Sequence, residues 1–100
     1  MFGVGTALVV PVDVLVHECS MPASDGDGHV YRARVLGRRR QDRTWIGWLE
    51  FRPLGSGGVV RRTARETTQP SRNALLYWAL GLDAVYLEGA LKRLVSPART

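Results

Sequence analysis

The sequence predicts an α+β domain, in which a four-stranded antiparallel meander sheet is covered on one face by a C-terminal αα-hairpin. Through residues 12–67, apolar and charged residues alternate with period two, and short segments of turn-forming residues interrupt the alternation. After Pro70 the period changes, and apolar residues recur every three or four positions through residues 70–95. The chain has 100 residues, enough for a single core, so we expect residues 1–100 to form one domain.

Four segments have the alternation of strands, namely 12–18, 29–40, 44–53 and 59–67. The connections between them read SMPASDGDG, QDR and LGSGG, and Gly, Pro, Asp and Ser favour turns. Short connections between sequential strands indicate antiparallel neighbours. Residues 1–10 are apolar and are a candidate fifth strand, paired with an edge of the same sheet or exchanged with a second copy.

Two helices are predicted at the C-terminal end. Pro70 and Ser71 begin the first, which runs to about Leu80, and Ser71 suits the N-cap. Gly81 is expected in the left-handed conformation that often ends a helix. Asp83 is expected to cap the second helix, which ends near residue 95. The apolar stripes consist of Leu75, Trp78, Ala79 and Leu82 in the first helix and Leu87, Ala90, Leu91, Leu94 and Val95 in the second.

The hydrophobic pattern also predicts how the two central strands pair. If Leu49 lies opposite Val35, apolar side chains share one face, and Arg34 faces Glu50 on the other. A slip of one residue would place Arg34 against Leu49, so we expect the first register. We therefore predict an ion-pair ladder on a solvated sheet face.

In the next hairpin, pairing Phe51 with Val60 would place Arg61 opposite Glu50 as a further member of this ladder. Trp45 would then face the core and Trp48 the outer surface. An exposed tryptophan beside arginines is typical of sheets that stack single-stranded nucleic acid. The residues of this alternative surface are Trp48, Arg32, Arg52 and Arg65.

Charge is divided unevenly along the chain, whose net charge is +5. Residues 1–31 carry four acidic and no basic residues, whereas residues 32–100 carry fourteen basic and five acidic ones. Such a division indicates an anionic partner, or attraction between the two halves within or between chains. Thirteen of the fourteen basic residues are Arg, a bias that GC-rich coding alone produces, so the excess is weak evidence for nucleic acid.

Two histidines and the single cysteine are candidate zinc ligands. His17 and Cys19 share a strand face, and His29 would lie opposite Cys19 if the first two strands pair. The spacing fits no common zinc pattern, and a buried apolar role for Cys19 is the favoured interpretation. The loop that begins at Asp25 fails as an EF-hand, because its twelfth position is Leu36 and not glutamate.

Polar residues cluster where the last strand leads into the first helix. They are candidates to bind a small anion at the helix N-terminus, although capping and turn formation explain the same residue types. The candidates are Glu66, Thr67, Thr68, Arg72 and Asn73, with Tyr77 and Tyr86 from the helices.

No catalytic set and no cofactor motif is recognisable, so the sequence favours a small non-catalytic binding or assembly module that forms a homodimer. Single-stranded nucleic-acid binding is the first alternative, and a metal or enzymatic domain is the second. Pro11 and Asp13 interrupt the apolar N-terminal run, so we expect no membrane span. A single cysteine favours a reducing compartment, and we expect the cytoplasm.

Overall fold

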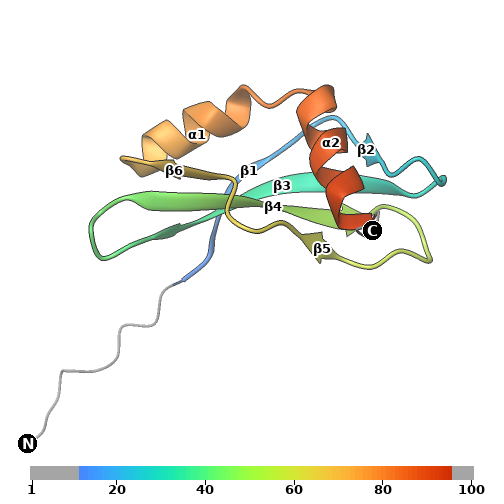
Figure 1. The fold of residues 1–100 in the computed structure, drawn as a ribbon, viewed down its shortest axis with the longest axis horizontal. Coiled ribbons are helices and arrows are strands. Elements are labelled where there is room, and N and C mark those ends of the chain that lie inside the picture. Colours follow the sequence, from blue (N-terminus) through green and yellow to red (C-terminus); the bar gives the residue numbers. More distant parts are fainter. Residues whose placement is uncertain (1–11, 96–100) are drawn as a thin grey trace, which may run out of the picture.

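A curved antiparallel sheet carries two helices on one face (Figure 1). The computed structural model describes residues 12–95. The predicted fold class is confirmed, with one short strand that was not expected and with two short strands in place of the expected fourth. The elements are β1 (Val14–Glu18), β2 (Ala23–Ser24), β3 (Val30–Arg39), β4 (Trp45–Pro53), β5 (Arg61–Arg62), β6 (Thr67–Gln69), α1 (Arg72–Leu80) and α2 (Ala84–Val95).

The strand order is β1-β3-β4-β5, with β2 also paired to β3 and β6 also paired to β4. The prediction of one strand over 59–67 is wrong, because that segment follows β4 as two separate short strands. Between them the N–H of Leu49 donates to the hydroxyl of Thr63 (3.0 Å), so a side chain takes the place of a ladder carbonyl. The N–H of Thr63 in turn donates to the carbonyl of Leu49 (2.9 Å), so the hydroxyl and the N–H of Thr63 hold the segment to β4 without a continuous ladder.

The predicted register of the central hairpin is confirmed, with Val35 opposite Leu49. In the next hairpin the prediction is wrong by one residue, because Glu50 pairs with Arg62 and not with Arg61. A shift of one residue exchanges the two faces of a strand. Arg61 therefore lies on the face that the helices cover.

Both helix starts are confirmed. The Ser71 hydroxyl accepts the N–H of Ala74 (3.0 Å), and a carboxylate oxygen of Asp83 accepts the N–H of Tyr86 (2.9 Å). The expectation for Gly81 is wrong, since its φ of −88° and ψ of −1° are right-handed and it simply continues the last turn. Within residues 12–95 no single helix is long and apolar enough to cross a membrane. Only α1 and α2 taken together have the length and composition of a membrane span, and they are bent by 98° relative to each other.

The core lies between the helices and one face of the sheet, as the two apolar stripes predict. Leu75 of α1 reaches deepest, because it sits over Gly37 and Gly47, which face each other in β3 and β4. A Cβ on either glycine would lie 2.5 or 2.6 Å from a Leu75 methyl group. The main core side chains are Tyr31, Ala33, Val35, Leu49 and Phe51 from the sheet and Leu75, Ala79, Leu87, Ala90 and Leu91 from the helices.

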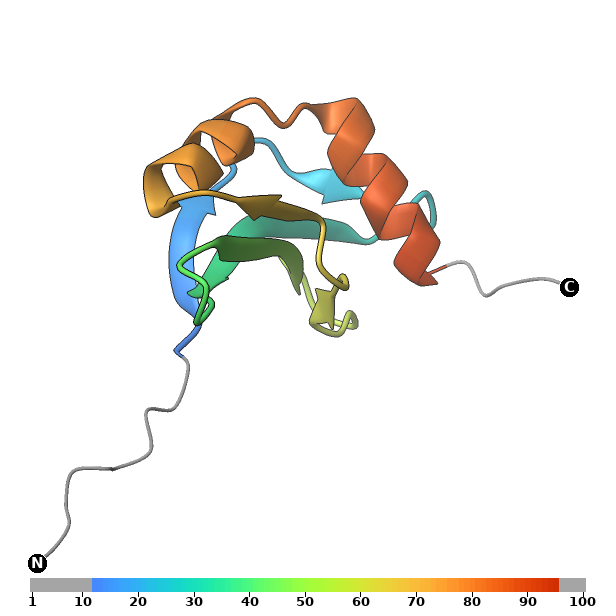
Figure 2. The same ribbon diagram turned by 60° about the vertical axis from the view of Figure 1, so that its left-hand side comes forward.

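The sheet curls away from the helices, so that its other face is concave (Figure 2). Asp13 precedes β1 and Arg62 belongs to β5, at opposite ends of the strand order, yet a carboxylate oxygen and a guanidinium nitrogen lie 3.8 Å apart. This concave face, formed by the even-numbered residues of β3 and β4, is the one that the sequence predicts to be solvated.

Candidate functional site

The centre of the concave face is an ion cluster around Glu50, which is only 1% exposed. Its carboxylate accepts hydrogen bonds from Arg34 (3.1 Å), Arg52 (2.8 Å) and Arg62 (3.0 and 3.2 Å). Burial acts to raise the pKa of Glu50, but the hydrogen bonds and charges of these arginines outweigh it and hold the pKa below its usual value. The predicted ion-pair ladder is confirmed, with Arg62 in the place of Arg61. The expectation that this face is solvated is wrong at its centre, because Glu50 is buried and its charge is paired within the protein.

The expectation that Trp48 is exposed is wrong, since its side chain is 8% exposed. The curl of the sheet brings Arg38 over the indole, with the guanidinium carbon 5.4 Å from the ring centre. Arg38 is held there by Asp13, which accepts two hydrogen bonds from it at 2.8 and 3.0 Å. Trp48 therefore offers no free ring face on which a base could stack.

The arginines predicted to surround Trp48 are mostly engaged as well. Arg32 donates to the carbonyl oxygens of Cys19 (3.1 Å) and Ser20 (2.7 Å). Arg52 belongs to the ion cluster. Arg65 is exposed and forms no ion pair with any described residue. The predicted stacking platform is therefore not formed on this face.

The three candidate zinc ligands do not meet. His17 and Cys19 line one hollow of about 240 Å³ beneath the turn between the helices, as their shared face predicts. The prediction that His29 opposes Cys19 is wrong, because the Cys19 N–H bonds to Ala33 (2.9 Å) and His29 pairs with Asp25 (3.0 Å). Residues 20–28, which connect β1 to β3, contain β2, and β2 itself pairs with β3. The connection therefore runs alongside β3 and is not a simple loop. Within 12–95 no group of three His, Cys, Asp or Glu side chains is placed to hold a metal ion, and burial raises the pKa of the Cys19 thiol.

Glu66, from the predicted anion cluster, has a structural role in the fold. Its carboxylate accepts hydrogen bonds from the Tyr86 hydroxyl (2.5 Å) and from Arg93 (3.1 Å), which ties the segment before β6 to α2. Burial, followed by the bond to Glu66, raises the pKa of Tyr86 to about 12. The carboxylate that was expected to face a ligand thus faces its own helix.

The other members of that cluster make separate contacts. The Thr67 hydroxyl accepts a bond from Gln69 (2.7 Å), and Arg72 lies over the ring of Trp45 at 6.0 Å. The remaining members are exposed on β6 and α1, namely Thr68, Asn73 and Tyr77. These side chains do not converge on a common centre.

Sequence reasoning missed the arginines at the β3–β4 turn. Arg39, Arg40 and Arg43 are exposed and form no ion pair with any residue in 12–95. Backbone hydrogen bonds close the turn: the Arg40 N–H donates to the Thr44 carbonyl (2.7 Å) and the Arg43 N–H to the Arg40 carbonyl (2.9 Å). The carboxylate of Asp42 accepts the N–H of Thr44 (3.0 Å). The run RRRQDR was the available signal, but it was interpreted only as the end of a strand and a turn.

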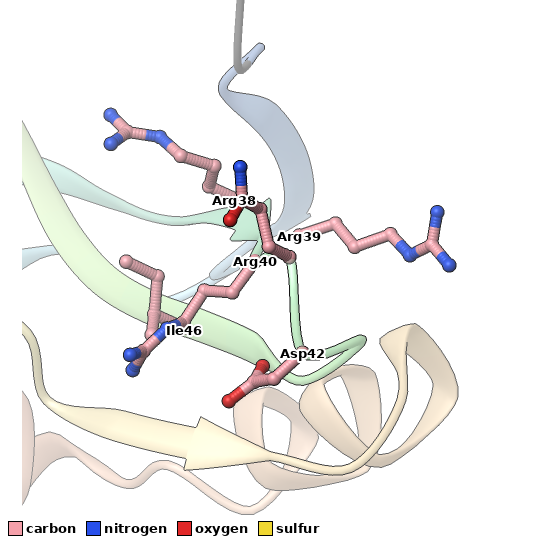
Figure 3. A pocket seen from close by; sticks show the side chains of 6 residues that line it. Arg38, Arg39, Arg40, Asp42 and Ile46 are labelled. Carbon is pink, nitrogen blue, oxygen red and sulfur yellow. The ribbon is translucent and has the colours of Figure 1, made fainter.

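Figure 3 shows the hollow at this turn, where the side chains of Arg38, Arg39 and Arg40 extend in three different directions. With Asp42 and Ile46 they line an open hollow of about 600 Å³. We call Arg39, Arg40 and Arg43 the arginine turn. Because the side chains of Arg39 and Arg40 extend in different directions, they present positive charge over a surface and not toward a single point.

Comparisons of the chain with protein-family models, with curated proteins and with solved structures found no match.

Proposed function

We propose that this protein is a non-catalytic binding module that holds a nucleic acid through phosphate contacts made by the arginine turn. The observation that carries the proposal is the set of three exposed arginines in one tight turn, with no carboxylate partner among the described residues. Arginines without a carboxylate partner are free to neutralise phosphates. The planar guanidinium group matches a phosphate with two parallel hydrogen bonds.

The backbone of the turn supports this role. Arg43 has a φ of 75°, in the left-handed region that favours glycine. An L-residue there costs roughly 1–2 kcal/mol relative to its usual conformation. A glycine would relieve that strain but would remove one of the three charges, so the turn retains a charge at the expense of stability.

The arrangement suits an extended polyanion. β1 begins with Val14 opposite Gly37, so the hairpin beyond Gly37 projects past its neighbour on that side. Arg72 adds a fourth guanidinium beside the hairpin, over Trp45, which pairs with Arg39. On the other side β6 pairs with β4 up to Trp45, so the turn at 40–44 is the part that projects beyond both neighbours and can approach a phosphate backbone.

Base stacking has no support in this geometry. The ring of Trp48 is covered by Arg38, and that of Trp45 lies beneath Arg72. Contacts to phosphates carry no sequence information by themselves. We therefore expect binding that depends steeply on salt and weakly on base sequence.

The test is fluorescence anisotropy with labelled duplex and single-stranded oligonucleotides over a range of salt concentrations. The variant Arg39→Gln/Arg40→Gln removes two charges from the turn, and the matched control Arg65→Gln/Lys92→Gln removes two exposed charges elsewhere. Each lost phosphate contact lowers the slope of log K against log salt by about 0.9, so we expect the turn variant to lose up to about 2 from the slope and the control to lose little. Equal effects of the two variants, or no binding by the wild type, would overturn the proposal.

Self-association is the second candidate, as predicted from the sequence. It is supported by β1, which pairs with β3 on one side only within the described residues, and by the exposed side chains of Val12 and Leu15 along it. Residues 1–10, predicted to take part, lie outside the described residues. Light scattering of the wild type and Leu15→Lys tests it: we expect a dimer that the substitution dissociates, and a wild-type monomer at all concentrations would refute it.

We also propose, as the sequence predicts, that the protein works in a reducing compartment, the cytoplasm. The free, buried thiol of Cys19 supports this location.

A further inference from the structure

The end of the sheet opposite the arginine turn contains a second, more enclosed hollow of about 190 Å³. It lies where the β2–β3 loop, the β4–β5 loop and the C-terminal end of α2 come together, on the far side of the fold from the β3–β4 turn in Figure 1. Asp25, His29, Tyr31, Gly58 and Arg61 are among the residues that line it. None of these residues has a part in the function proposed above.

Arg61 is the notable member of this hollow. It is half-buried, and its Nε is shielded from water without an acceptor. The other half-buried arginines of residues 12–95 each donate to at least one acceptor: Arg32 to carbonyl oxygens, Arg34 to Glu50 and Arg38 to Asp13, although the Nε of Arg34 also lacks an acceptor. Arg61 forms no ion pair with any described residue. A half-buried guanidinium without an acceptor lowers stability, and an oxyanion in the hollow that Arg61 lines would supply one.

Two features of the backbone place Arg61 there. The one-residue shift of register sets it opposite Phe51, on the face that the helices cover. The β4–β5 loop then closes tightly at Gly58, where a Cβ would lie 2.8 Å from Pro53 and 3.7 Å from the Tyr31 hydroxyl. Glycine at this position lets the loop approach the 1% exposed ring of Tyr31 and form one wall of the hollow.

Asp25, one of the two carboxylates that line the hollow, is already compensated. Asp25 accepts hydrogen bonds from the N–H of Asp27 (2.7 Å), the N–H of His29 (3.3 Å) and the His29 ring (3.0 Å). The bond from Asp27, followed by the His29 ring and N–H, outweighs desolvation and lowers the pKa of Asp25. Because Nδ1 of His29 is engaged, its Nε2 is the nitrogen left for another partner.

We propose that this hollow binds a small oxyanion, a carboxylate or a phosphate group, through the guanidinium of Arg61, with Tyr31 and His29 as additional contacts. The hollow of about 190 Å³ suits a small ligand, and the carboxylate of Asp27, which also lines it, disfavours a polyanion. This ligand is therefore distinct from the nucleic acid proposed for the arginine turn.

The test is a titration of the ¹⁵N-labelled protein followed by NMR, in which the Nε–H signal of an arginine is observed directly. Acetate and inorganic phosphate are the two probes, and chloride at equal ionic strength is the control. We expect a saturable shift of the Arg61 Nε–H and Gly58 amide signals with at least one probe, and the probe that saturates identifies the class of oxyanion. Shifts that never saturate, or that equal those with chloride for both probes, would overturn the proposal.

Variants separate this site from general electrostatics. Arg61→Gln should abolish the saturable shift at Gly58, Arg61→Lys should weaken it several-fold because the bidentate geometry is lost, and Arg65→Gln should leave it unchanged. If Arg61→Gln does not fold, Arg61→Lys alone decides the outcome. Loss of the shift in Arg65→Gln to the same degree would refute a role for Arg61, and no result here depends on whether the arginine turn binds nucleic acid.

Discussion

Replacing Glu50 by glutamine tests whether the concave face is a built ion cluster. Glutamine keeps the shape of the side chain but turns an NH₂ group toward at least one arginine that now donates to a carboxylate oxygen. Removing one partner of a fully buried pair costs about 3–5 kcal/mol. The side chains of Arg52 and Arg62 are 52% and 53% exposed and can return to water, which leaves Arg34 as the main uncompensated charge. We therefore expect a loss of about 2–3 kcal/mol in the free energy of unfolding, somewhat below the range for a fully buried pair.

The assay is urea unfolding of the wild type and Glu50→Gln at neutral and acidic pH. The folded-state pKa of Glu50 is lowered, so its contribution is fully present above the unfolded value of about 4.3 and is lost as pH falls through the folded value. The difference between the two proteins should thus be large at neutral pH and should narrow in acid.

The matched control is Glu18→Gln. Glu18 lies opposite Arg34 in the β1–β3 register, but it is exposed and forms no ion pair with any residue in 12–95. We expect its substitution to change stability by less than about 0.5 kcal/mol. If Glu50→Gln is as stable as the wild type, or if the difference persists unchanged in acid, the reasoning about the cluster is wrong.

Three further predictions concern the turn, the core and the α2 contact. Arg43→Gly should raise the free energy of unfolding by about 1 kcal/mol, since glycine adopts the observed φ of 75° without strain; thermal unfolding measures it, and a lower melting temperature would contradict it. Gly47→Ala should lower stability by about 1–3 kcal/mol, because its Cβ would lie 2.6 Å from a Leu75 methyl group, whereas in a Leu75→Ala background the same change should cost less; equal costs in both backgrounds would show that this contact is not responsible. Tyr86 should ionise near pH 12, so its bond to Glu66 contributes stability that is present below the unfolded value of about 10 and is lost as pH rises through 12; alkaline unfolding of wild type and Tyr86→Phe should converge over that range, and a constant gap would refute it.

The zinc hypothesis shows where sequence reasoning about the site failed. That His17 and Cys19 share a face follows from the period of a strand, and it is confirmed. The position of His29 depended on how many residues the connecting segment uses, and β2 uses more of them than a simple loop would. The run of arginines at the β3–β4 turn was visible in the sequence, but whether they had partners depended on which carboxylates the fold brings near.

The sequence by itself determined the features with local causes: the α+β class, the caps at Ser71 and Asp83, and the pairing of Val35 with Leu49. Side-chain periodicity and capping act over a few residues, so the chain encodes them directly. Only the tertiary structure decided the burial of Trp48 and Glu50, since it follows from a curl that brings opposite sides of the sheet together. Such a closure sums small twists over several strands and loops, and no short pattern of residues specifies it.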